Sequence, residues 1–262
     1  MLFRFIESLA QTRPIAPIPL LLIEDPIAQN KDITEDPQQQ QHLAAAELEA
    51  AILRALIPIN KTLRKQEATH QSTIAALNQP HNFFHFTGHG YHDSQKPQNS
   101  YIKLSDEDLT FKDVTQLNLR PYHLINLAAC ETGITGNDTE LGEYIGLSSA
   151  FLKAKANTVL STLWQVNAIS NTWFTIRFYQ LLLAGHPAPI ALKLTQTWLK
   201  TLTIPVLIEW TQALPSLDYH STKLLNLAIE ELTEIQGKLG PDTLYSDPYH
   251  WGAFILTGAI AL

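Results

Sequence analysis

His85-Phe86-Thr87-Gly88-His89-Gly90 is the stretch of sequence from which the fold can be worked out. The apolar run 83–87 has the length and composition of a buried β-strand, and we expect the glycine-rich residues after it to form a turn. His89 stands between two glycines, just past the expected strand end. The segment therefore predicts a strand that delivers one imidazole to the edge of a sheet.

A second stretch has the same design: Leu124-Ile125-Asn126-Leu127-Ala128-Ala129-Cys130-Glu131-Thr132-Gly133. Its apolar run, 124–129, is again a strand candidate, and Cys130 follows it as His89 follows the first run. In an open α/β sheet, reactive groups collect at the carboxyl ends of the strands. We therefore expect His89 and Cys130 to reach one edge from neighbouring strands, as a candidate cysteine–histidine dyad.

The rest of the chain alternates short apolar runs with amphipathic segments. Further strands are expected at 18–23, 101–104, 158–164 and 251–256. Helices are expected at 1–12, 42–56, 66–77, 141–154, 169–184, 189–202 and 221–239, with a short one entered at 109–114. The polar segment 36–41, most of 91–121, and 203–220 are expected to be irregular. This alternation predicts an α/β fold with a mostly parallel sheet and helices on both faces.

Composition narrows the class of protein. The chain has 262 residues, a net charge of −7 and one cysteine, so it has no internal disulfide. The absence of a basic cluster argues against nucleic-acid binding. We find neither a secretory leader nor an apolar run long enough to span a bilayer, so we expect a cytoplasmic protein without membrane contact.

A cysteine attacks as its thiolate, which a nearby imidazole stabilises or generates. The acyl intermediate also needs donors for its oxyanion, and the backbone N–H groups of Gly90 and Cys130 are the expected pair. Gly88 and Glu131 flank them as supporting residues. No acid stands at a fixed spacing, so the sequence predicts a dyad rather than a triad.

Substrate contacts are expected in the loops at the same edge, where the candidates are Asp93, Asp138 and Trp164. The two carboxylates would favour a basic substrate residue, although exposed loop carboxylates usually have no such function.

Two other interpretations concern these residue types. A lone cysteine is most often a small buried side chain, but both reactive residues stand at expected strand ends, which weakens that explanation. His85, His89 and His92 suggest zinc, yet no cysteine or carboxylate ligand stands beside them at a motif spacing. We expect no metal and no cofactor.

The motifs resemble those of the CHAT family, caspase-like domains of clan CD that are often fused to tetratricopeptide repeats (TPR) in bacteria, cyanobacteria especially. In chain order they are H-x-x-x-H-G at 85–90, A-C-x-T-G at 129–133, G-E-x-x-G-L-x-x-A-F-L at 142–152, L-W-x-V at 163–166, F-Y at 178–179 and W-x-x-F-x-x-x-G at 251–258.

The resemblance implies a caspase-like three-layer sandwich over residues 18–262, with 1–17 as a lead-in segment and a helical insertion at about 203–247. It also implies a cysteine endopeptidase that cleaves protein or peptide substrates. His89 would be its general base, Cys130 its nucleophile and Gly90 an oxyanion donor, under the control of a TPR-containing regulator.

Two positions depart from the family pattern. Asn167 follows L-W-x-V where the family usually has an aspartate, and Ala128 stands where a serine is frequent. The missing acid motivates an alternative, a catalytically silent member that serves as a protein-interaction or scaffold module.

Overall fold

The computed structural model describes residues 19–24, 37–57, 59–91, 93, 96–132, 145–239 and 243–259, without the side chains of 37–43, 128–132, 145, 238 and 239. The strands in these ranges are Leu20–Glu24 (β1), Lys61–Arg64 (β2), Phe83–Tyr91 (β3), Tyr101–Ile102 (β4), Leu109–Thr110 (β5), Leu124–Thr132 (β6), Thr158–Thr162 (β7) and Phe254–Gly258 (β8). They form one sheet in the order β2-β1-β3-β6-β7-β8, with β4 and β5 attached beside β3.

The sheet is mostly parallel. The pairs β1–β2, β1–β3, β3–β6 and β6–β7 are parallel, while β8 runs antiparallel to β7 and the short strands β4 and β5 pair antiparallel. Because β3, β6 and β7 point the same way, their carboxyl ends meet at one edge of the sheet.

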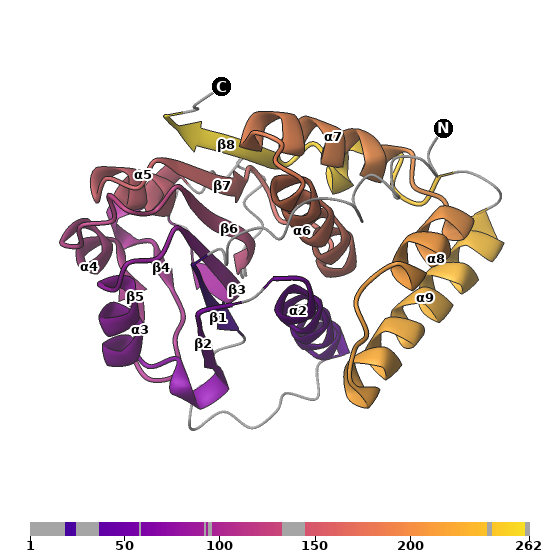
Figure 1. The fold of residues 1–262 in the computed structure, drawn as a ribbon, viewed down its shortest axis with the longest axis horizontal. Helices are drawn as coiled ribbons and strands as arrows, with labels where there is room; N and C mark the ends of the chain where they lie inside the picture. Colours follow the sequence, from indigo (N-terminus) through magenta and orange to yellow (C-terminus); the bar gives the residue numbers. More distant parts are fainter. Residues whose placement is uncertain are drawn as a thin grey trace.

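Helices cover both faces of this sheet (Figure 1). Their bounds are Pro37–Leu56 (α2), His70–Leu77 (α3), Phe111–Thr115 (α4), Ile145–Lys153 (α5), Ala168–Leu183 (α6), Ala188–Lys200 (α7), Ile204–Gln212 (α8) and Tyr219–Leu239 (α9), with 3₁₀ turns at Lys65–Glu67 (η1), Pro97–Asn99 (η2) and Pro248–His250 (η3). The helices α3, α4 and α5 pack on one face, α2 and α6 pack on the other, and α9 packs on α2. The expected α/β fold with a mostly parallel sheet and helices on both faces is confirmed.

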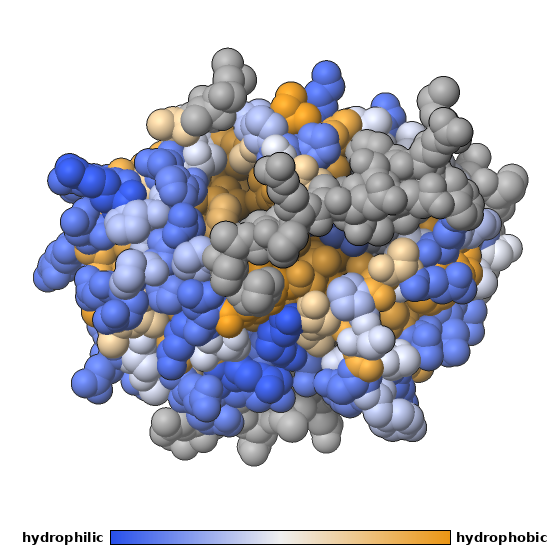
Figure 2. Space-filling view, viewed as in Figure 1, coloured by the Kyte–Doolittle hydropathy of each residue, from blue (hydrophilic) through white to orange (hydrophobic). Residues whose placement is uncertain are grey.

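Strand β1 shows how the sequence produces these layers. All five of its residues are buried, as expected of a strand covered on both faces. Leu21 and Ile23 join the core on the α3 side, whereas Leu20 packs with Leu53 of α2 and Tyr179 of α6. In the space-filling view, hydrophilic residues lie over α3 and hydrophobic residues gather in the middle of the face, beside α2 and α6 (Figure 2).

The expected turn at Gly88-His89-Gly90 is wrong, because β3 continues through it to Tyr91. Gly90 pairs with Ile102 of β4 on one side and with Thr132 of β6 on the other. Gly88 pairs with Cys130 of β6, and this strand pairing overrides the preference of the two glycines for turns.

Three further elements differ from expectation. The glutamine-rich segment is not a loop, because α2 already begins at Pro37, and proline is well suited to the first helical turn. The edge strand β2 was missed because only Leu63 is buried in it. Helix α8 lies in the segment expected to be irregular, again with a proline in its first turn. The helix expected at 1–12 falls outside the described residues.

Candidate active site

The backbones of His89 and Cys130 lie on adjacent strands at the carboxyl edge of the sheet. His89 belongs to β3 and is half-buried, and its carbonyl accepts a hydrogen bond from the Lys103 N–H at 2.9 Å. Cys130 belongs to β6 and pairs with Gly88, so that Glu131 is the partner of His89. A strand spacing of about 4.8 Å and a rise of about 3.3 Å per residue put the two Cα atoms about 6 Å apart.

The side chains of Cys130 and Glu131 lie outside the described residues. A hydrogen bond between the thiol and the imidazole therefore stays a prediction, as do the supporting role of Glu131 and the oxyanion donors expected at Gly90 and Cys130.

A bulge in β6 sets which residue stands beside His89. Between the pairs His85–Asn126 and Thr87–Ala129, β3 advances by two residues (87 − 85) and β6 by three (129 − 126). An unbroken register from His85–Asn126 would pair His89 with Cys130, but the extra residue moves Cys130 opposite Gly88. Bulges of this kind bend a strand and redirect its end.

Directly before the bulge, a buried polar cluster joins the two strands to α2 and α6. The His85 Nε2 atom lies 3.0 Å from Oε1 of Glu49, whose Oε2 accepts a hydrogen bond from the Asn171 amide at 3.1 Å. The Tyr179 hydroxyl lies 3.4 Å from Nδ1 of His85. His85 is 0 % exposed and Glu49 is 1 % exposed, so this carboxylate is satisfied entirely from within the protein.

The tautomer of His85 follows from these partners. An ionised carboxylate only accepts hydrogen bonds. The Nε2 atom of His85 therefore carries a hydrogen and donates a hydrogen bond to Glu49. The Nδ1 atom then accepts a hydrogen bond from Tyr179 when the imidazole is neutral. Burial raises the pKa of the Tyr179 phenol, which keeps its proton, while a hydrogen bond with the Asn126 side chain opposes that rise.

Sequence reasoning missed this cluster. Both ring nitrogens of His85, one of the three histidines that suggest zinc, face Glu49 and Tyr179. No group of three metal-ligating side chains occurs in the described part of the chain, which leaves out His92. Glu49 lies in an alanine-rich helical segment whose sequence predicts a solvent-facing charge. The only sequence signal for its burial is His85, a polar residue in the middle of the apolar strand β3.

The loop after β7 adds Trp164 to the same edge. Its indole N–H donates to the Tyr249 carbonyl at 3.0 Å, and the side chain is partly buried. Asn167, which replaces the aspartate common in the family pattern, is the N-cap of α6 and its Oδ1 accepts a hydrogen bond from the Ser170 N–H at 3.1 Å. Asparagine and aspartate cap helices about equally well, so this structural task is retained without the acid.

The remaining edge candidates are Asp93 and Asp138. The Asp93 carboxylate accepts hydrogen bonds from the Lys96 N–H at 2.8 Å and from the Asn99 amide at 2.9 Å, and so ties residue 93 to η2. This structural task accounts for the residue, and a substrate contact stays a prediction. Asp138 lies outside the described residues.

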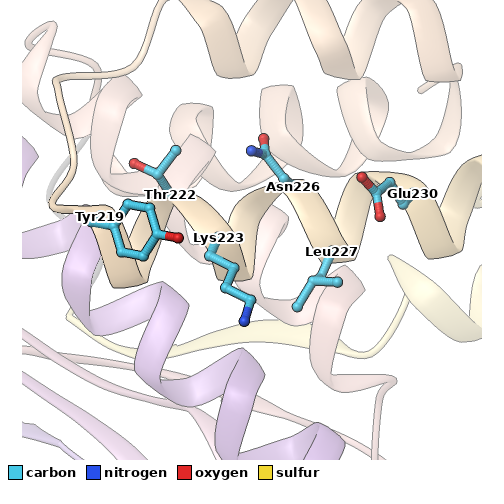
Figure 3. A pocket seen from close by; sticks show the side chains of 6 residues that line it. All are labelled: Tyr219, Thr222, Lys223, Asn226, Leu227 and Glu230. Atoms are coloured by element: carbon cyan, nitrogen blue, oxygen red, sulfur yellow. The ribbon is translucent and has the colours of Figure 1, made fainter.

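A hollow of about 330 Å³ lies elsewhere, on the exposed face of α9 (Figure 3). All of its lining residues belong to that helix, and none comes from β3, β6 or β7: Tyr219, Thr222, Lys223, Asn226, Leu227 and Glu230. It is therefore separate from the edge that carries His89. Among the described residues, no helix is both long and apolar enough to cross a bilayer.

Two solved structures of proteinases resemble the chain at low sequence identity. One is the crystal structure of the Arg-specific cysteine proteinase gingipain R, with a TM-score of 0.40 and 13% identity over 64% of this chain and 37% of that one. The other is the complex of Porphyromonas gingivalis RgpB pro- and mature domains, with a TM-score of 0.46 and 12% identity over 97% of this chain and 51% of that one. This protein thus spans about half or less of the length of these proteinase chains.

No curated protein sequence matches the chain. The family model for the CHAT domain, by contrast, matches residues 4–259, nearly the whole sequence. This is the family that the motifs at 85–90 and 129–133 indicate. The chain belongs to the CHAT domain family.

Proposed function

We propose that this protein is a cysteine endopeptidase in which Cys130 is the nucleophile and His89 the general base. The observation that carries the proposal is the parallel pairing of residues 88–90 with residues 130–132 at the carboxyl edge of the sheet. Membership of the CHAT domain family supports it. Strand geometry puts the two Cα atoms about 6 Å apart. Contact between the thiol and the imidazole is itself part of the proposal, because His89 and Cys130 are one register step apart and side chains alternate between the two faces of a strand.

The proposed reaction needs only these two groups, a peptide and water. His89 accepts the thiol proton, and the Cys130 Sγ attacks the peptide carbonyl carbon. The tetrahedral intermediate collapses, the C–N bond breaks and His89 gives its proton to the leaving amine. Water, deprotonated by His89, then hydrolyses the thioester and restores the thiol. A protein or peptide substrate, the absence of a cofactor and control by a TPR-containing regulator are part of the same proposal.

The replacement of the family aspartate by Asn167 motivated the scaffold alternative. Because Asn167 caps α6 through its side-chain oxygen, the change leaves the local fold intact and gives no specific support to a silent module. The scaffold function therefore enters as an outcome of the test below.

The test is covalent labelling of Cys130 by a panel of peptide acyloxymethyl ketones that differ in the residue next to the reactive group. We expect His89→Ala to slow labelling by on the order of 100-fold, because these probes need a thiolate and a nearby acid. The control is His123→Ala, which changes an exposed histidine outside this edge. Equal labelling rates in the wild type and His89→Ala would contradict the dyad.

A second experiment separates the peptidase from the scaffold. New protein termini are mapped in cells that produce the wild type or Cys130→Ala. The proposal expects cuts that disappear in Cys130→Ala, whereas identical sets of termini favour the scaffold module.

A further inference from the structure

The buried polar cluster stands at the same chain distance from both proposed catalytic residues. His85 precedes His89 by four residues on β3, and Asn126 precedes Cys130 by four residues on β6. These two residues are register partners, the last pair before the bulge. Four residues of extended strand span about 13 Å, so the cluster lies directly behind the edge that carries the proposed site.

The members of the cluster come from four different elements. Glu49 belongs to α2, Asn171 and Tyr179 to α6, His85 to β3 and Asn126 to β6. Each is at most 6 % exposed. The hydrogen bonds among them therefore fix both strands to both helices on this face of the sheet.

A gain in the overall stability of the protein does not explain why such a cluster is buried. Burying a carboxylate among helices costs desolvation free energy, and apolar residues of similar volume usually pack at least as well. Directional hydrogen bonds instead favour one geometry over its alternatives. If β3 slid by one residue, an apolar side chain would face Glu49 and the charge of this carboxylate would be left unpaired.

We propose that the His85–Glu49 pair, together with Tyr179 and Asn126, is a positioning device that fixes the register of β3 and β6 behind His89 and Cys130. The inference rests on the proposed function, because it concerns the reactivity of Cys130. None of the cluster residues touches the reacting atoms, so they are positioning residues and not catalytic ones.

The readout is the pH profile of Cys130 alkylation by iodoacetamide. Cys130 is the only cysteine, so the reaction reports one thiol without ambiguity. The midpoint of the profile reflects the thiolate and the imidazole beside it. A role in folding alone would change the unfolding midpoint of a variant but would leave this profile unchanged in its folded state.

The main variant is the double replacement Glu49→Leu/His85→Phe, which removes the buried charge together with its histidine partner. We expect a native circular dichroism spectrum, an alkylation midpoint shifted toward that of His89→Ala, and a rate at neutral pH that falls about tenfold, since small misplacements of reactive groups are costly. A folded double variant with the wild-type profile would overturn the inference.

Tyr179→Phe decides the question if the double variant does not fold, because it removes one hydroxyl and keeps the ring. The proposal expects a smaller shift in the same direction, and an unchanged profile counts against it. The matched control is Tyr122→Phe, a second buried tyrosine, whose hydroxyl donates to the Leu77 carbonyl on the other face of the sheet. It is expected to lower stability without moving the profile.

His89→Ala separates the two proposals. If it leaves the wild-type profile unchanged, the dyad fails. If it shifts the profile while the folded double variant and Tyr179→Phe do not, only the positioning role fails.

Discussion

Asn167 shows how one residue can depart from a family pattern without changing the local structure. We expect Asn167→Ala to lower the free energy of unfolding by about 1 kcal/mol, because the Ser170 N–H loses its side-chain acceptor. Asn167→Asp keeps the acceptor and adds a negative charge at a helix N-terminus, so it is expected to be neutral or slightly stabilising. Urea unfolding of the three proteins checks both expectations.

The control at this scale is Asn226→Ala, an exposed position in the middle of α9. Alanine is the better helix former there, so stability should stay equal or rise slightly. An Asn167→Ala variant as stable as the wild type would show that the cap contributes nothing.

At the scale of elements, two helical glycines are expected to respond to alanine with opposite signs. A Cβ at Gly237 in α9 meets nothing within 4 Å, so Gly237→Ala should raise the free energy of unfolding by about 0.5–1 kcal/mol. A Cβ at Gly146 in α5 would lie 2.5 Å from the Pro97 carbonyl oxygen and 2.7 Å from Ser100 Oγ. Gly146→Ala should therefore destabilise by at least about 1 kcal/mol, since α5 must move away from η2.

Thermal and urea unfolding of the two alanine variants, measured side by side, check this pair. A stabilised Gly146→Ala would mean that α5 does not pack closely against η2.

The same scale shows what the sequence predicts well. Apolar runs such as those of β1 and β7 were placed within a few residues, because burial on both faces of a sheet leaves an unambiguous pattern. The strand β2 is not predicted, because it is an edge strand of the sheet and its exposed Lys61 and Arg64 interrupt the apolar pattern of a buried strand. Gly88-His89-Gly90 is predicted as a turn because its two glycines favour turns. The strands that pair with it, β4 and β6, come later in the chain and leave no signal in the local sequence.

For the candidate site, the edge was predictable and the register was not. The rule that parallel strands end at one edge brings His89 and Cys130 near each other from sequence alone. The bulge in β6 has no local sequence signal. The His85–Glu49 contact joins residues 36 positions apart, and no periodicity in either segment reports it.

At the scale of the whole molecule, stability is expected to fall with acidification. Burial lowers the pKa of His81 and, against the opposing charge of Asp247, that of His250. The unfolded chain therefore binds protons below about pH 6.5 that the folded protein does not bind. The contribution of these groups to stability is fully present above that pH and is lost as the pH falls through it.

His81→Phe tests the contribution of His81, which is 6 % exposed and whose two ring nitrogens both lack a hydrogen-bond partner. Urea unfolding at about pH 7.5 and about pH 5.5 should show a smaller loss of unfolding free energy in the variant than in the wild type. An equal loss in both proteins would contradict the assignment.

The inserted residue in β6 also bears on how sequences of this kind are compared. Two homologues could carry the same histidine and cysteine signatures and still hold them one step apart, depending on whether β6 has this extra residue between Asn126 and Ala129. A signature search scores both identically. Counting the residues that separate the buried asparagine from the cysteine would sort such chains into two geometric classes before any of them is assayed.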